Sequence, residues 1–137
     1  MADSNEQKPL LVLNVDDRPA SLYTRDRLLR QTGYTVANAT TGKDALTLAE
    51  RLRPDLVLLD IHLPDIDGRE VCRKIKDHPD LKDTPVVLAS TTVHGDAAQS
   101  ELMHWAYADA FLAEPFDKNA LESTLAAVFR AAGKSKT

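Results

Sequence analysis

The sequence has 137 residues, of which 43% are hydrophobic and 28% charged, as is typical of a single globular domain with a buried core. Its formal net charge of −4 at pH 7 argues against nucleic acid as a partner, because a phosphate backbone is bound by a basic surface. The one cysteine excludes an intramolecular disulfide, and no apolar stretch reaches the roughly 20 residues that span a bilayer, so we expect no membrane association.

The chain starts with a polar segment, MADSNEQK, which lacks the apolar core of a signal peptide. We therefore expect a cytoplasmic protein. Residues 1–8 are predicted to form a flexible tail, residues 9–131 one domain, and residues 132–137 a second flexible tail, because short polar termini fray.

Five apolar runs of strand length follow one another along the chain. They are LLVLNV (10–15), YTVANA (34–39), DLVLLD (55–60), PVVLAS (85–90) and DAFLA (109–113). The first, third and fourth are almost continuously apolar, which is typical of strands buried on both faces of a parallel sheet.

Stretches with helical spacing of apolar residues separate these runs, as at Ala45, Leu48, Ala49 and Leu52. Such spacing predicts amphipathic helices that each bury one stripe. Start signals are Asp17 followed by Pro19, Thr41, and Asp117, and stop signals are Gly33 and Pro54.

The chain is thus a series of five strand–helix repeats. Right-handed crossovers and doubly buried strands predict an α/β fold, a doubly wound parallel sheet with helices on both faces. In such folds the functional site lies at the carboxyl ends of the strands, so polar residues at those ends are the candidates.

The strand ends carry Asp16 and Asp17, Asp60, Ser90 and Glu114. Taken alone, Asp17 is equally well explained as a helix cap and Ser90 better explained by a backbone hydrogen bond. Asp60 closes a buried apolar strand, where a carboxylate is costly unless it is paired or binds a metal. Three aspartates from two neighbouring strands repel one another unless a divalent cation joins them, and oxygen ligands of this kind suit Mg²⁺. A carboxylate beside Mg²⁺ can act as a nucleophile towards a phosphoryl group.

At this point the motifs NVDD (14–17), LLDIHLPDIDG (58–68), VVLAS (86–90) and FLAEPF (111–116) match a family in order and spacing. The chain resembles the receiver domain of two-component response regulators over residues 9 to about 131. The resemblance implies the CheY-like, flavodoxin-like (βα)5 fold with strand order 2-1-3-4-5. It also implies a signalling domain and not an enzyme, whose only chemistry is self-catalysed aspartyl phosphorylation.

Transferred by position, the family pattern makes Asp60 the phospho-acceptor. Asp16, Asp17 and Asp60 would hold Mg²⁺ together with the backbone carbonyl of His62. Ser90 would donate its hydroxyl to the phosphoryl group.

Further roles concern the response to phosphorylation. Phe111 would be the switch ring that turns inward as Ser90 moves, and Pro64 and Gly68 would shape the loop after Asp60. The family's partners are a histidine kinase or a phosphotransfer protein, and its signalling surface is the fourth helix, fifth strand and fifth helix, which would also be the homodimer surface. The expected function is therefore a single-domain response regulator that signals by docking to another protein.

Haloacid-dehalogenase-type phosphatases also use an aspartate nucleophile with Mg²⁺, but in an Asp-x-Asp arrangement after the first strand. Here the first strand ends in the adjacent pair Asp16–Asp17, and the best nucleophile candidate, Asp60, closes the third. The receiver interpretation is therefore preferred.

Glu114 departs from the family pattern, which has lysine before this proline. Four carboxylates at the strand ends carry four negative charges, of which Mg²⁺ offsets two, so an ionised Glu114 that points inward would oppose phosphorylation. It can escape by protonation, by turning to solvent, by pairing with a cation such as Arg18, or by approaching the metal. We expect Asp60 to accept phosphate with altered kinetics or a weaker response; the alternative is a degenerate receiver acting as a phosphorylation-independent adaptor.

Smaller departures are Tyr107, at the position of a helix-ending glycine, and Thr91, where alanine is usual. With Trp105, Tyr107 either packs into the core or forms a partner or dimer patch, since large aromatics anchor interfaces. Thr91 would hinder phosphoryl access or add a hydrogen bond. His94, with His62, is placed on a loop near the pocket, and Cys72 is predicted to lie in the core.

Overall fold

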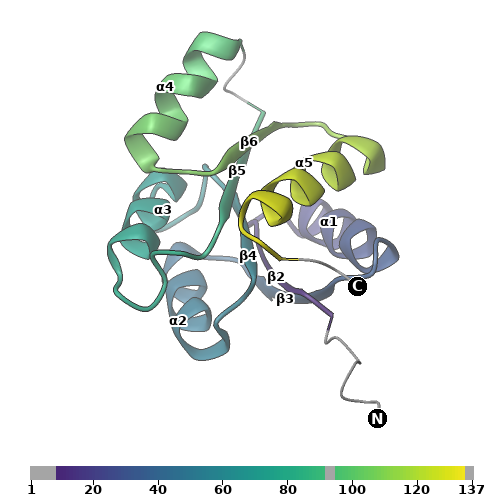
Figure 1. Cartoon of the computed structure of the whole chain (residues 1–137), viewed down its shortest axis with the longest axis horizontal. Coiled ribbons are helices and arrows are strands. Elements are labelled where there is room, and N and C mark those ends of the chain that lie inside the picture. Colours follow the sequence, from purple (N-terminus) through teal and green to yellow (C-terminus); the bar gives the residue numbers. More distant parts are fainter. Residues whose placement is uncertain (1–8, 92–94, 135–137) are drawn as a thin grey trace.

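The computed structural model describes residues 9–91 and 95–134, apart from the side chains of residues 96, 97, 102, 103 and 105. Strands and helices alternate along the chain (Figure 1). With the labels of the figure they are β2 (Leu11–Val15), α1 (Pro19–Gln31), β3 (Thr35–Ala39), α2 (Gly42–Leu52), β4 (Leu56–Asp60), α3 (Gly68–Asp77), β5 (Val86–Ser90), α4 (Asp96–Ala106), β6 (Ala110–Ala113) and α5 (Lys118–Ala131).

The five strands form one parallel sheet in the order β3-β2-β4-β5-β6. In chain order this is 2-1-3-4-5, so the predicted fold is confirmed. Val15 lies opposite Leu59, and Asp60 lies opposite Ala89. This register brings the carboxyl ends of β2, β4 and β5 to one edge, with β4 at the centre of the sheet and β2 and β5 beside it.

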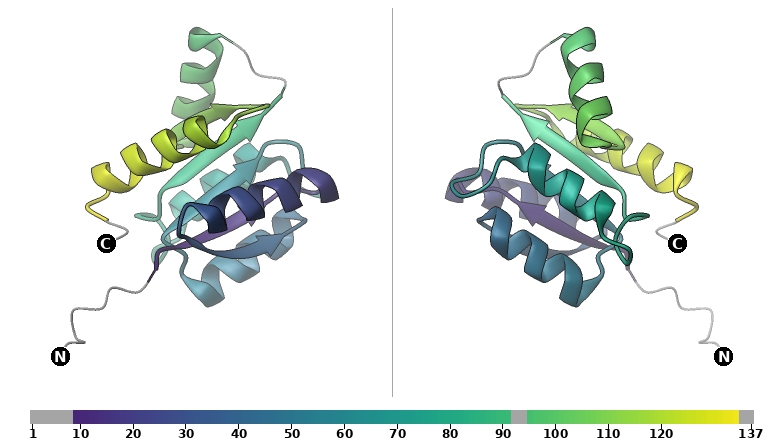
Figure 2. Two further views of the ribbon diagram at one scale, coloured as in Figure 1. Left: turned by 90° about the vertical axis from the view of Figure 1, so that its right-hand side faces the viewer. Right: turned by 90° about the vertical axis from the view of Figure 1, so that its left-hand side faces the viewer.

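Helices cover both faces of the sheet. Figure 2 shows α1 and α5 over one face, and α2 and α3 over the other with α4 on the same side. Successive strand residues point to opposite faces, so Val12 and Leu58 pack under α1 and α5, whereas Leu13 and Leu59 pack under α2 and α3. All residues of β4 and β5 are buried, as their continuous apolar runs predict.

Helix ends follow the predicted signals with one exception. The side chains of Thr41 and Asp117 accept N–H bonds at the starts of α2 and α5, and Gly33 follows α1 with a φ of 102°. The expectation that Asp17 caps α1 is wrong, because the helix begins at Pro19 and its N-cap is Arg18, which makes no side-chain cap bond. Asp17 is therefore left exposed at the strand edge.

Helix α4 ends with Tyr107 in the left-handed conformation, at a φ of 63°. The tyrosine thus keeps the backbone geometry that glycine adopts most easily. The residue is 53% exposed, with the Arg73 guanidinium 4.8 Å from its ring centroid, so the core-packing alternative is wrong for Tyr107. The Trp105 side chain and His94 lie outside the described residues.

Cys72 is buried as predicted, with Sγ 3.2 Å from the carbonyl oxygen of Ala106. Beyond α5, Lys134 Nζ donates to the carbonyl oxygen of Asp55 at 3.2 Å. The proposed domain limits stay predictions. Within the described part of the chain, no helix has the length and apolar character needed to cross a membrane.

Candidate functional site

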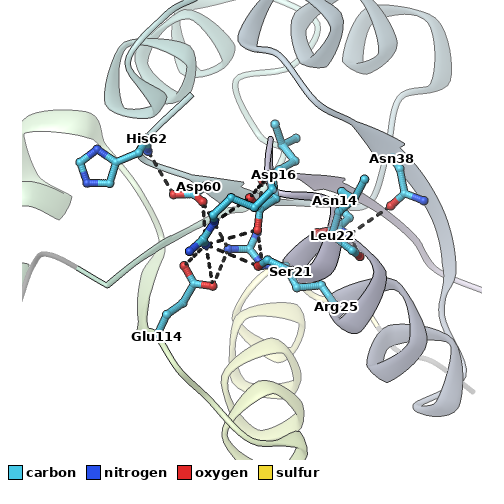
Figure 3. A network of polar contacts seen from close by, with 11 residues as sticks. Asn14, Asp16, Ser21, Leu22, Arg25, Asn38, Asp60, His62 and Glu114 are labelled. Carbon is cyan, nitrogen blue, oxygen red and sulfur yellow. Dashed lines mark hydrogen bonds and ion pairs between the residues drawn. The ribbon is translucent and has the colours of Figure 1, made fainter. Parts of the chain in front are cut away.

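Three carboxylates meet at the carboxyl edge of the sheet. Asp16 and Asp17 directly follow β2, Asp60 ends β4, and each offers an oxygen within 4.8 Å of the other two (Figure 3 shows Asp16 and Asp60). Asp16 and Asp60 are buried, whereas Asp17 is exposed. An all-oxygen cluster that is buried on one side and open on the other fits a hard divalent cation that keeps some of its water.

A cleft of about 290 Å³ opens above this cluster. Solvent and a small donor can therefore approach the buried Asp60 carboxylate from outside. The lining residues are Asp17, Arg18, Asp60, His62, Leu63, Pro64 and Thr91.

Both oxygens of the Asp60 carboxylate accept hydrogen bonds. Its Oδ1 accepts the His62 backbone N–H at 3.0 Å, and Arg18 Nη2 donates to its Oδ2 at 3.2 Å. Burial raises the pKa of Asp60 to about 6, and the negative charges of Asp16 and Glu114 add to that effect. A bound cation would reverse it, since it favours the ionised carboxylate.

The pKa of Asp16 is shifted in the opposite direction from that of Asp60, although Asp16 is fully buried. Burial acts to raise the pKa of Asp16, but a hydrogen bond from Ser21, the Arg18 N–H at 3.0 Å and the Arg25 charge together lower it. Arg25 Nε lies 3.5 Å from Asp16 Oδ2. Asp16 is thus kept ionised, as a metal ligand must be.

The loop after β4 is tied to its neighbours by close backbone contacts. Gly68 N–H donates to the Ile61 carbonyl at 2.7 Å, and a Cβ at Gly68 would lie 2.1 Å from the Asp60 carbonyl oxygen. The glycine therefore lets α3 approach the backbone of Asp60. In the same loop, the Asp65 carboxylate accepts the N–H groups of Gly42 and Lys43 at the start of α2.

The other residues assigned from the family pattern lie near this edge. Ser90 is buried at the end of β5, opposite Ala113 in the register. Phe111 is partly buried and packs against the core beneath α2 and α3. The His62 ring points away from Asp60 (Figure 3). The role of the His62 backbone carbonyl as a Mg²⁺ ligand stays a prediction.

Glu114 follows β6 and points into the site. It is 9% exposed, and its backbone N–H donates to the Ser90 carbonyl at 2.9 Å. Arg18 Nη2 donates to both its carboxylate oxygens, at 3.2 and 3.3 Å. Of the predicted escapes, pairing with Arg18 is the one that the structure contains.

A second cation, Arg25 of α1, was not anticipated. Its side chain is only 2% exposed, and Nη2 lies 3.1 Å from Glu114 Oε2 and 3.9 Å from Asp60 Oδ2 (Figure 3). A signal was present, since Arg25 precedes the buried Leu29 by four residues and so shares its helix face.

Asn14 was also missed. It is buried in β2, and its Nδ2 donates to the Leu22 carbonyl at 3.2 Å and to Asn38 Oδ1 at 3.0 Å (Figure 3). These bonds join β2 to α1 and β3, so Asn14 fixes the strand end that carries Asp16.

Comparisons with known proteins by sequence and by structure agree on one family. The sequence model of the response regulator receiver domain matches residues 12–126. The chain is 35% identical over 124 residues to the probable transcriptional regulator ycf27 of Guillardia theta, covering 90% of this chain and 47% of that protein. It is 31% identical over 107 residues to the polar-differentiation response regulator DivK of Brucella anthropi, covering 78% of this chain and 85% of DivK.

A solved structure has the same architecture. The receiver domain of sensor histidine kinase PA1611 from Pseudomonas aeruginosa PAO1 superposes with a TM-score of 0.80 at 27% identity, over 93% of this chain and 100% of that chain. That structure contains a magnesium ion coordinated in its active-site cleft. The first curated relatives are mostly longer proteins, of which the chain spans about half or less.

Proposed function

Since this chain belongs to the response regulator receiver domain family, we propose that it accepts a phosphoryl group on Asp60 within a two-component phosphorelay. The observation that carries the proposal is the buried Asp60 carboxylate, adjacent to Asp16 and Asp17 beneath an open cleft. Receiver domains are signalling domains, and the chemistry proposed here is limited to the self-catalysed gain of this phosphoryl group.

The transfer uses the Asp60 carboxylate as nucleophile. An oxygen of Asp60 attacks the phosphorus of a phosphohistidine on a histidine kinase or phosphotransfer protein, and a new O–P bond forms. The P–N bond breaks, and its electron pair stays on the histidine nitrogen. Ser90, at the neighbouring strand end, donates its hydroxyl to a phosphoryl oxygen.

Asp16, Asp17 and Asp60 would hold Mg²⁺, with the backbone carbonyl of His62 as a further ligand. Bound Mg²⁺ offsets negative charge as the anionic donor approaches. The oxygen-only donor set and the ionised state of Asp16 support this assignment, and so does the magnesium ion in the PA1611 receiver domain.

Signalling would proceed through protein contacts in the cytoplasm. Phe111 turns inward as Ser90 moves, and this alters the surface of α4, β6 and α5, where a downstream protein or a second copy binds. The match to most of the response regulator DivK supports signalling of this kind. Exposed Tyr107, at the end of α4, is a candidate contact residue.

A phosphorylation-independent adaptor is not favoured. The acceptor, the acidic pair and the hydroxyl residue all lie at one edge of the sheet, and two guanidiniums offset the charge of Glu114.

The test is modification by acetyl phosphate with Mg²⁺, followed by intact-protein mass spectrometry and beryllium fluoride binding by fluorine NMR. We expect a single phosphoryl adduct on the wild type that Asp60→Asn lacks, whereas Asp83→Asn, an exposed aspartate change, keeps it. A wild type that forms neither the adduct nor the fluoride complex would overturn the proposal.

A further inference from the structure

We propose that Arg25, oriented by Glu114, is the buried cation that contacts the phosphoryl group on Asp60. The inference rests on the proposed function. In the family pattern a lysine at position 114 contacts the phosphoryl oxygens with its ammonium group, and the inference assigns this role to a residue of α1.

The Arg25 guanidinium is fixed in place. Its Nη1 donates to the Val15 carbonyl at 3.2 Å, and the Phe116 ring centroid lies 6.0 Å from Cζ. Glu114 pairs with Nη2 at 3.1 Å, and its own backbone is tied to Ser90. A guanidinium held from these sides needs little reorganisation when an anion arrives.

Two of its nitrogen atoms retain donor capacity. Nε and Nη2 of Arg25 are buried without a hydrogen-bond acceptor in suitable geometry among the described residues. In agreement with this, Nη2 is 3.9 Å from Asp60 Oδ2, which is an ion-pair distance and too long for a hydrogen bond. A phosphoryl group on Asp60 adds oxygens next to this donor, and a hydrogen bond to a charged oxygen is stronger than one to a neutral acceptor.

Charge counting agrees with this role. Asp16, Asp17, Asp60 and Glu114 carry four negative charges, and Arg18 and Arg25 carry two positive ones. Glu114 and Arg25 together therefore add no net charge, whereas Glu114 alone would oppose the phosphorylated state.

Arg18 is less suited to this role. Its side chain is 48% exposed and lines the cleft through which a donor must enter, so it can leave when the phosphoryl group arrives. Arg25 is buried against the carboxylates. Its departure would leave their buried negative charge uncompensated, which is costly.

The test compares Glu114→Gln with the double variant Arg25→Met/Glu114→Gln, which differ only at Arg25. The double variant removes both members of the Arg25–Glu114 pair, and in Glu114→Gln the buried Arg25 still faces Asp16 and Asp60, so both proteins should fold. We expect beryllium fluoride to bind about tenfold or more weakly to the double variant with Mg²⁺ present, the size of one lost hydrogen bond to a charged group.

Mg²⁺ affinity, measured separately by calorimetry, distinguishes contact from a merely structural role. Loss of a cation near the acidic cluster should leave Mg²⁺ affinity unchanged or raise it, whereas a collapsed site would lower the affinity for both ions. Arg30→Met is the matched control, because Arg30 is an exposed arginine of the same helix paired with Asp26. It should leave both affinities unchanged.

Two results would overturn the inference while the proposed function stands: equal beryllium fluoride affinity in the compared pair, or a parallel fall in Mg²⁺ affinity. If the double variant is unfolded, Arg25→Met/Glu114→Lys replaces it, since that change moves the cation to position 114. It should fold and bind beryllium fluoride more tightly than Arg25→Met, and failure to do so in a folded protein also overturns the inference. If the wild type itself binds no beryllium fluoride, the proposed function and this inference fail together.

Discussion

At the scale of single residues, the ionised Asp60 carboxylate destabilises the folded protein, and the size of this effect depends on pH. Burial raises its pKa from the ordinary 3.8 to about 6. The folded state therefore binds the proton more tightly than the unfolded state does. The stabilisation from the protonated group is complete below the unfolded pKa and is lost as pH rises through about 6.

Asp60→Asn removes this titration. In metal-free protein we expect the variant to be more stable than the wild type at neutral pH by about 1–3 kcal/mol, with the difference shrinking as pH falls towards 4. Urea denaturation in EDTA at a series of pH values measures it. A difference that does not vary with pH would contradict the prediction.

Mg²⁺ should stabilise the wild type more than the Asp60→Asn variant, because the variant lacks one charged ligand.

Gly68 contributes to the site by having no side chain. Gly68→Ala places a Cβ 2.1 Å from the Asp60 carbonyl oxygen, so we expect α3 to shift and stability to fall by about 1–3 kcal/mol. Mg²⁺ affinity should fall as well, because the displaced backbone carries Asp60. Gly42→Ala is the comparison, since its closest contact is Val71 Cγ2 at 2.9 Å, a side-chain atom that can move. Equal losses of Mg²⁺ affinity in the two variants would refute this account.

At the scale of the elements, the end of α4 is strained by its sequence. Tyr107 adopts a φ of 63°, which costs an L-residue with a Cβ about 1–2 kcal/mol relative to glycine. We therefore expect Tyr107→Gly to be more stable than Tyr107→Ala by about 1 kcal/mol in thermal or urea denaturation. Both variants lose the contact with Arg73, so that contact does not affect the comparison. The reverse order would mean that the helix ends differently in solution.

The elements themselves were predictable from the sequence. Every strand lies within its predicted run and begins one residue later, because a continuous apolar run with polar ends leaves little freedom in a doubly covered sheet. Asp16, Asp17 and Asp60 were predictable as a cluster for the same reason, since parallel strands end at one edge. Pro19 was correctly predicted to lie at the start of α1, but the capping residue was not, because the helix begins at Pro19 itself and its N-cap is Arg18 in place of Asp17.

Charged residues that end up buried were harder to predict. The helix face that Arg25 shares with Leu29 indicates that Arg25 can be buried, but nothing nearby in the sequence indicates that its carboxylate partner is Glu114. That pairing depends on how α1 packs beside the segment after β6, which is a tertiary contact. Asp65 is exposed, but its partners were equally hard to predict, since they lie at the start of α2 and precede it by 22 and 23 residues.

At the scale of the whole molecule, Cys72 reports on opening of the domain. Burial raises the pKa of its thiol to about 12, and Sγ contacts the end of α4. Because the thiolate is the reactive form, we expect iodoacetamide to modify the folded protein very slowly and the urea-unfolded protein readily. Mass spectrometry over time measures this. Rapid modification without urea would show that α4 separates from α3 in the native state.

The pairing of Arg25 with Glu114 has a consequence for synthesis. Arg25 is made early and its carboxylate partner much later, after every strand of the sheet has been translated. A chain growing from its N-terminus therefore has Asp16, Asp60 and Arg25 but not the residue that orients the arginine. On the ribosome, a nascent chain that already contains Asp60 therefore still lacks the carboxylate that pairs with the buried Arg25.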